Sequence, residues 1–89
     1  MEEMPSDHPV TATLLVSCRD RTGLVAALST FVFSQGGNIL DADQHAERES
    51  GEFFMRLEWD LAGFALGRDQ IQSEVAGLAQ RFNLRWELT

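Results

Sequence analysis

The sequence reads Phe53-Phe-Met-Arg-Leu-Glu-Trp-Asp-Leu61 at its most regular point. Hydrophobic side chains occupy every second position from Phe53, and Arg56, Glu58 and Asp60 lie between them. Because successive side chains of a strand point to opposite faces, this alternation predicts a strand with one buried face and one solvated face. Such a strand is typical of an antiparallel sheet that is covered on one side only.

A second alternating segment, residues 38–47, comes just before this strand. Every second residue from position 41 has an ionisable side chain: Asp41, Asp43 and His45. The residues between them are uncharged. The polar turn Arg48-Glu-Ser-Gly51 separates the two segments and is short enough to join neighbouring strands. The pair therefore predicts an antiparallel hairpin.

Two other segments have the periodicity of amphipathic helices. The first helical stripe consists of Leu24, Leu28, Phe31 and Val32. Gln35-Gly-Gly37 follows it, and glycine commonly ends a helix. The second helical stripe consists of Ile71, Val75, Leu78, Ala79 and Phe82.

Strand-like segments lie at both ends of this arrangement. Residues 11–18 are β-branched and aliphatic with apolar groups on both faces, which indicates an inner strand, and residues 84–88 alternate again. The order β-α-β-β-α-β predicts an α+β, ferredoxin-like sandwich: a four-stranded antiparallel sheet with two helices on one face. We expect residues 10–89 to form this single domain and residues 1–9 to be a flexible N-terminal tail.

The composition argues against several classes of function. The chain has 89 residues and a net charge of −7 without any lysine, so it lacks the basic surface that nucleic acids and anionic membranes require. No apolar run approaches the length of a membrane span, and the acidic N-terminus does not resemble a signal peptide, which favours the cytoplasm. Cys18 is the only cysteine and is expected to be a buried thiol.

The junction between the first strand and the first helix has the most informative polar residues. Asp20-Arg21-Thr22-Gly23-Leu24 places a carboxylate, a guanidinium and a hydroxyl beside the N–H groups of a helix N-terminus. Such a corner can hold a small zwitterion, because amides and Arg bind its carboxylate and Asp binds its ammonium. We expect Asn38 to lie beside this corner. The alternative is that Asp20 and Thr22 only cap the helix.

Asp41, Asp43 and His45 could also be read as metal ligands. Residues two apart on a strand are separated by about 7 Å, so the three could not chelate one ion unaided. We favour a polar sheet face whose side chains pair across strands, with Arg56 opposite, and we predict no metal and no cofactor. The sequence has no nucleophile elbow and no phosphate loop, so we assign no catalytic residues and do not expect this chain alone to be an enzyme.

Four stretches together closely resemble the amino-terminal ACT domain of formyltetrahydrofolate deformylases. They are Cys18–Ala27, Gly36–Ile39, Asp41–His45 and Phe53–Arg56. The likeness extends from about Thr11 to Leu88, and Arg19 departs from it, because that family often has proline there.

The resemblance implies a dimer that binds a small amino acid, glycine or methionine, at Asp20, Arg21, Thr22, Gly23, Leu24 and Asn38. The resembled enzymes hydrolyse 10-formyltetrahydrofolate to formate and tetrahydrofolate for purine synthesis, with their chemistry in a larger carboxy-terminal domain that this chain lacks. The expected function is therefore an amino-acid-sensing regulatory domain of such a deformylase. The alternatives are a ligand-independent dimerisation module and a stand-alone ACT regulatory protein.

Overall fold

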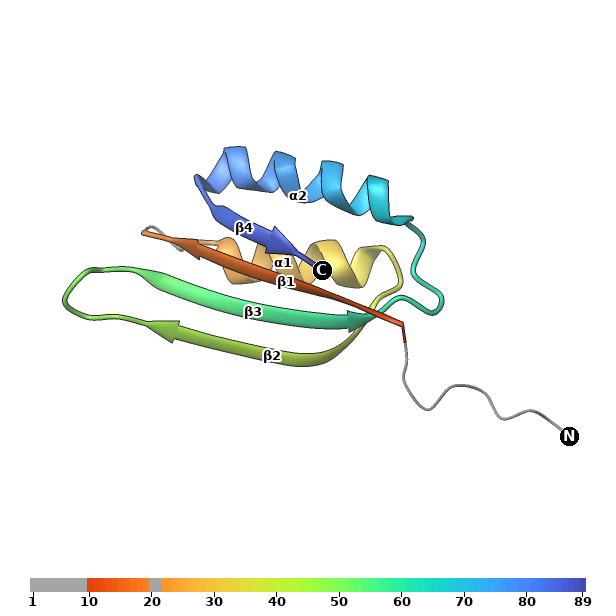
Figure 1. Ribbon diagram of the computed structural model, residues 1–89, viewed down its shortest axis with the longest axis horizontal. Coiled ribbons are helices and arrows are strands. Elements are labelled where there is room, and N and C mark those ends of the chain that lie inside the picture. Colours follow the sequence, from red (N-terminus) through yellow and green to blue (C-terminus); the bar gives the residue numbers. More distant parts are fainter. Residues whose placement is uncertain (1–9, 20–21) are drawn as a thin grey trace, which may run out of the picture.

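The structure is a computed structural model that describes residues 10–19 and 22–89. Its elements in chain order are β1 (Thr11–Cys18), α1 (Leu24–Ser34), β2 (Asn38–Ala46), β3 (Phe53–Asp60), α2 (Arg68–Phe82) and β4 (Arg85–Leu88). The four strands form one antiparallel sheet in the order β2-β3-β1-β4, with both helices on the same side of it (Figure 1). The predicted ferredoxin-like fold is confirmed. The predicted tail, residues 1–9, lies outside the described residues.

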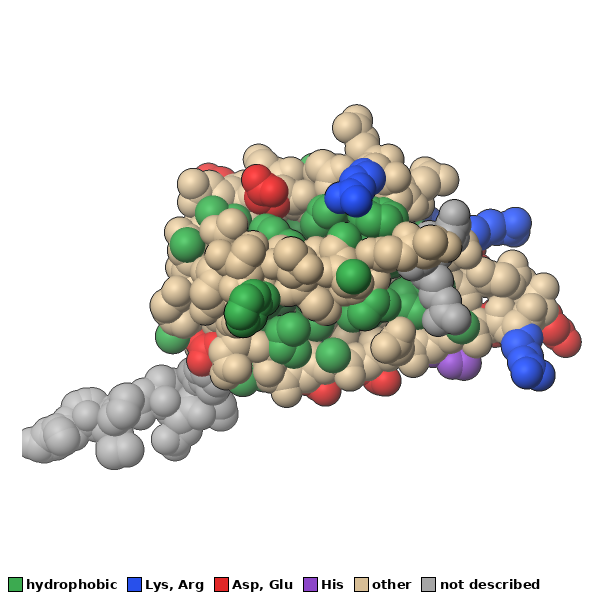
Figure 2. Space-filling model, turned by 180° about the vertical axis from the view of Figure 1, so that it is seen from behind, with side chains coloured by type: hydrophobic (Ala, Val, Ile, Leu, Met, Phe, Trp, Pro, Cys, Tyr) green, Lys and Arg blue, Asp and Glu red, His purple; other side chains and the backbone are tan. Residues whose placement is uncertain are grey.

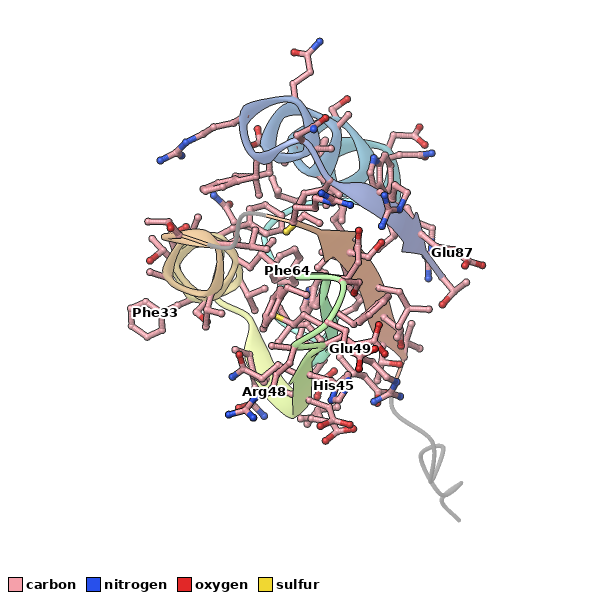
Figure 3. The ribbon with its side chains drawn as sticks, turned by 90° about the vertical axis from the view of Figure 1, so that its left-hand side faces the viewer. Phe33, His45, Arg48, Glu49, Phe64 and Glu87 are labelled. Atoms are coloured by element: carbon pink, nitrogen blue, oxygen red, sulfur yellow. The ribbon has the colours of Figure 1, made fainter. Side chains whose placement is uncertain are left out.

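The core lies between the helices and the inner face of the two central strands. Trp59 of β3 is completely buried and meets the ring of Phe31 edge-on, with the ring centroids 6.3 Å apart. Phe64, from the loop before α2, packs against both rings and points into the interior (Figure 3). The stripe predicted for the first helix is buried as a whole, and Ile71 and Val75 are fully buried in α2. The two periodicities therefore identified the faces of both helices correctly.

Glycines set both ends of α1. Gly23 is the N-cap residue, with φ at 76°, and capping by Asp20 or Thr22 stays a prediction. Asp20 itself lies outside the described residues. At the other end, Gly36 has φ at 82°, and the N–H groups of Gly36 and Gly37 donate to the carbonyls of Phe33 and Val32. This glycine pair ends the helix as predicted.

β2 is an edge strand in which all nine residues are exposed. Ile39 is opposite Trp59 and Asp41 is opposite Glu58, so Leu40 is an additional residue at a β-bulge. Such a bulge shifts the alternation of a strand by one position. For this reason Ile39 faces the helix side, whereas Asp41, two residues later, faces the helix-free side.

The helix side also has hydrophobic side chains at its surface (Figure 2). Phe33 is the most exposed of the large ones at 80%, and it points away from α1 into solvent (Figure 3). None of the helices in the described residues is long and apolar enough to cross a membrane.

Candidate functional site

The predicted corner between β1 and α1 is only partly described. Asp20 and Arg21 lie outside the described residues, whereas Thr22 and Gly23 are exposed. Leu24 is fully buried, so its side chain belongs to the core and only its backbone can face a ligand. Cys18, just before the corner, is buried as predicted.

The N-terminus of α1 has the properties of an anion-binding end. The first helical hydrogen bond runs from the Ala27 N–H to the Gly23 carbonyl, so the N–H groups of residues 24–26 have no acceptor within the helix. The first turn contains no acidic residue that would neutralise the positive end of the helix dipole. Gly23 has φ at 76°, a backbone conformation that L side chains rarely adopt, and a side chain there would begin 4.0 Å from the ring of Phe82, an ordinary contact distance. This end of α1 can therefore accept a small carboxylate.

Asn38 does not lie beside this corner, so our prediction of its position within one chain is wrong. In the sheet register Asn38 pairs with Asp60, which pairs with Thr11 at the start of β1. The corner instead follows Cys18 at the other end of β1. The seven residue steps between Thr11 and Cys18 correspond to about 23 Å along the strand. In Figure 1 the α1–β2 connection lies at the end of the sheet where β1 begins, opposite the end where β1 finishes.

The polar residues of β2 form the cross-strand pairs that we favoured over a metal site. Asp41 accepts a hydrogen bond from Arg56 at 2.5 Å, and Arg56 also contacts Glu58 at 3.3 Å. His45 stacks on Phe54, with an angle of 23° between the rings. Among residues 10–19 and 22–89, no group of three His, Cys, Asp or Glu side chains is arranged to hold a metal ion.

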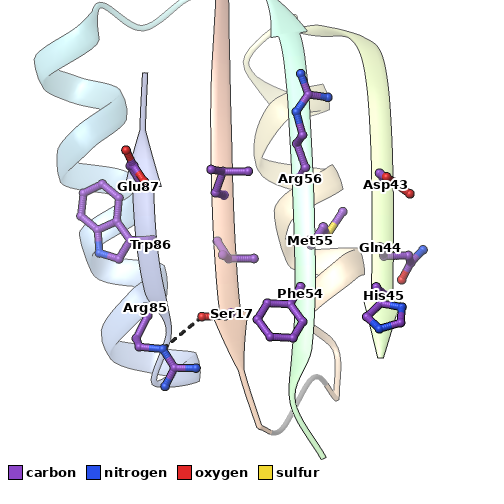
Figure 4. A pocket seen from close by; sticks show the side chains of 12 residues that line it. Ser17, Asp43, Gln44, His45, Phe54, Met55, Arg56, Arg85, Trp86 and Glu87 are labelled. Carbon is purple, nitrogen blue, oxygen red and sulfur yellow. Dashed lines mark hydrogen bonds between the residues drawn. The ribbon is translucent and has the colours of Figure 1, made fainter. Parts of the chain in front are cut away.

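The sequence reasoning missed a shallow hollow of about 440 Å³ on the helix-free face of the sheet (Figure 4). Side chains from all four strands line it, among them Leu15, Phe54, Arg85 and His45. Leu15 and Phe54, on the two central strands, are 42% and 43% exposed. The signal was present in the alternation of each strand, but it became visible only once the register had aligned the strands.

Comparisons with known proteins agree on the kind of domain. The model of the ACT domain family matches residues 12–79. The formyltetrahydrofolate deformylase of Bacillus subtilis is 42% identical over 90 residues, covering all of this chain and 30% of the relative. That of Synechocystis sp. is 43% identical over 79 residues, covering 89% of this chain and 28% of the relative. The crystal structure of a formyltetrahydrofolate deformylase from Pseudomonas syringae pv. tomato superimposes with a TM-score of 0.83 at 34% identity, over 89% of this chain and 26% of that one. The chain thus spans less than a third of the length of these relatives.

Proposed function

This chain belongs to the ACT domain family, and on that premise we propose that it is a regulatory domain that senses a small amino acid for a formyltetrahydrofolate deformylase. The observation that carries the proposal is the N-terminus of α1 beside Gly23, whose first turn contains no acidic residue. Glycine and methionine are the first ligands to test. A cytoplasmic location, and the hydrolysis of 10-formyltetrahydrofolate by a further domain, are parts of the same proposal.

In this proposal the charges of a zwitterion are divided between two kinds of group. Its carboxylate accepts hydrogen bonds from the first-turn amides of α1 and from Arg21, and its ammonium donates to Asp20. Thr22 adds a hydroxyl at the same corner. A ligand that binds one state of the deformylase better than the other shifts its activity, and such couplings are typically about 1–3 kcal/mol.

The position of Asn38 leads us to assign it to the corner of a partner subunit. β2 is a free edge strand, and two such edges can pair antiparallel around a two-fold axis. In an antiparallel pair of β2 strands, the start of one strand lies beside the end of the other. Asn38 of the partner subunit is therefore brought towards Ala46, at the end of β2. Ala46 is level with Cys18 in the sheet, and Cys18 directly precedes the corner. Each site is then shared between two chains, and the dimer is part of the sensing mechanism.

The first test is a titration of the purified chain with glycine and methionine, followed by amide chemical shifts. We expect shifts at Thr22, Gly23 and Leu24 at millimolar concentration. We expect N38A to weaken binding by about tenfold or more, because it removes hydrogen bonds to a charged ligand. Q72A, an exposed amide on α2, is the matched control and should bind as the unchanged chain does. The absence of shifts with every amino acid tested would contradict the sensing proposal.

A ligand-independent dimerisation module is the second candidate, and the full exposure of β2 favours it. Analytical ultracentrifugation with and without amino acids separates the two candidates. A dimer that forms equally in both conditions, with no change at the corner amides, supports the second candidate. A monomer in every condition contradicts it.

A further inference from the structure

We propose that the helix-free face of the sheet binds a basic polypeptide segment in which two lysine or arginine side chains flank an apolar one, in the order basic-x-apolar-x-basic. This proposal goes beyond amino-acid sensing, because it concerns a protein partner and a different surface. It rests on the charge of this face, on two carboxylates at the rims of its hollow and on the spacing between them (Figure 4).

The side-chain charges of the described residues are unevenly divided between the two sides of the sheet. The register and the alternation of the strands place seven carboxylates and three guanidinium groups on the helix-free face: Asp41, Asp43, Glu47, Glu52, Glu58, Asp60 and Glu87, with Arg19, Arg56 and Arg85. The hairpin turn and α2 together carry three charges of each sign, and α1 carries none. The net negative charge of residues 10–19 and 22–89 therefore lies on one face, which attracts a basic partner and repels a second copy.

The two arginines beside the hollow are already paired within the chain. The Arg85 Nη2 donates to Glu52 at 2.7 Å. The Arg56 N–H groups donate to Asp41 and to Glu58, and in Figure 4 the Arg56 side chain runs along β3 away from the hollow. Because neighbouring carboxylates compensate both guanidinium groups, they offer little repulsion to a basic side chain that enters the hollow.

Asp43 and Glu87 are the carboxylates of the hollow that remain available to a partner. Both residues line the hollow and are exposed. Within the described part of the chain, neither side chain accepts a hydrogen bond or joins an ion pair. Figure 4 shows them at the same level on the two outer strands, Glu87 on β4 and Asp43 on β2. A cationic side chain can therefore bind each of them without displacing a described neighbour.

Between these two carboxylates the hollow has an apolar floor. Leu15 of β1 and Phe54 of β3 both line it, and both are more than two-fifths exposed. An apolar side chain of the partner that settles on them removes apolar surface of both molecules from water, which favours binding. The hollow therefore offers an apolar contact between two anionic ends, which is complementary to an apolar side chain between two basic ones.

The spacing of the two carboxylates specifies the spacing of the basic residues. Glu87, Leu15, Arg56 and Asp43 form one row across the four strands, so three strand spacings separate the ends of the row by about 14 Å. In an extended peptide that crosses the sheet along this row, residues i and i+4 lie about 13 Å apart and point to the same side. Basic residues at i and i+4 therefore meet Glu87 and Asp43, and the residue at i+2 lies over the hollow beside Leu15. The side chains at i+1 and i+3 point into solvent.

The experiment titrates the purified chain with the end-blocked synthetic peptide Lys-Thr-Leu-Thr-Lys at low salt and follows amide chemical shifts. We expect shifts at Leu15, Asp43, Phe54 and Glu87, with a dissociation constant on the order of millimolar. Physiological salt should weaken the binding about threefold or more, because the ion pairs are exposed. The peptide Lys-Lys-Leu-Thr-Thr has the same composition and charge but adjacent lysines. It should bind about threefold to fivefold more weakly, because it meets only one of the two carboxylates.

A charge swap tests whether the two carboxylates determine the specificity. D43K/E87K should bind Lys-Thr-Leu-Thr-Lys about tenfold or more weakly, because like charges then face each other. It should instead bind Glu-Thr-Leu-Thr-Glu, which the unchanged chain should reject, and this transfer also shows that the variant is folded. E49K/E74K is the matched control: it changes the net charge equally in the hairpin turn and on α2, and it should bind the lysine peptide within about twofold of the unchanged chain.

The proposal is overturned if the lysine peptide causes no shifts on this face, if the two lysine peptides bind equally, or if the charge swap fails to transfer the binding. Shifts at Leu15 and Phe54 that depend on the protein concentration without any peptide would show that a second copy occupies the face, and would also overturn it. Peptide binding without an amino-acid response at the β1–α1 corner supports this proposal and contradicts the sensing function alone. A response at the corner without peptide binding does the reverse.

Discussion

Replacing Trp59 by alanine is expected to lower the free energy of unfolding by about 3–5 kcal/mol, the usual cost of truncating a large buried aromatic side chain. Trp59 is completely buried and contacts the rings of Phe31 and Phe64. Its removal leaves a cavity between α1 and the centre of the sheet. A domain of this size is stabilised by about 5–10 kcal/mol, so W59A should remain folded only marginally. Urea denaturation followed by far-ultraviolet circular dichroism measures the change.

Two companion variants separate packing from hydrogen bonding at this position. The Trp59 Nε1 is buried, and no partner for it is present in the described part of the chain. W59F keeps most of the ring and removes that unpaired donor, so we expect it to cost far less than W59A. F33A, at an exposed ring, should change the stability by less than about 0.5 kcal/mol. If W59A costs no more than F33A, the packing around Trp59 is not what stabilises the domain.

Replacing Gly37 by alanine is expected to lower the free energy of unfolding by about 1–3 kcal/mol, as in other overpacked interiors. A methyl group at this position would lie 2.5 Å from the Val32 Cγ1, 2.8 Å from the Val32 carbonyl oxygen and 2.9 Å from the ring of Phe64. The carbonyl oxygen accepts the Gly37 N–H at 2.9 Å and cannot retreat without breaking that bond. G37A must therefore displace the chain between α1 and β2.

G77A is the matched control, because the same substitution in α2 meets no atom within 4 Å. It should raise the stability by roughly 0.5–1 kcal/mol, because alanine is the better helix former. The two variants differ from their parent by one methyl group and are expected to change the midpoint of urea denaturation in opposite directions. A neutral or stabilising G37A would show that the α1–β2 connection is not closely packed.

Most of the fold could be predicted from the sequence because its signals are local. The alternation around Trp59 and the helical stripe from Leu24 to Val32 each report which face is buried, and the structure confirms both. The glycine pair at residues 36–37 ended α1 where expected. Composition and spacing are sufficient here because each element must bury one face against the same core.

The site was harder to predict because it depends on the register of the strands and on the direction in which α1 runs along the sheet. Asn38 follows α1 closely, yet α1 runs the length of the sheet and carries the chain to the end opposite the corner. The helix-free face depends on the alignment of four strands, and no single strand reveals that Arg85 and His45 lie in one row. The predicted ion pairing of Arg56 needed only neighbouring strands, and the structure confirms it.

The additional residue in β2 affects how this strand should be compared with its relatives. Ile39 and Asp41 are two residues apart and would face the same side of a regular strand. The bulge at Leu40 instead turns them to opposite sides of the sheet. A relative that conserves the acidic and imidazole side chains but is one residue shorter here would direct them under α1 instead of into solvent. The spacing between the glycine pair and Asp41, and not only the identity of the polar residues, should therefore decide whether an aligned sequence shares this surface.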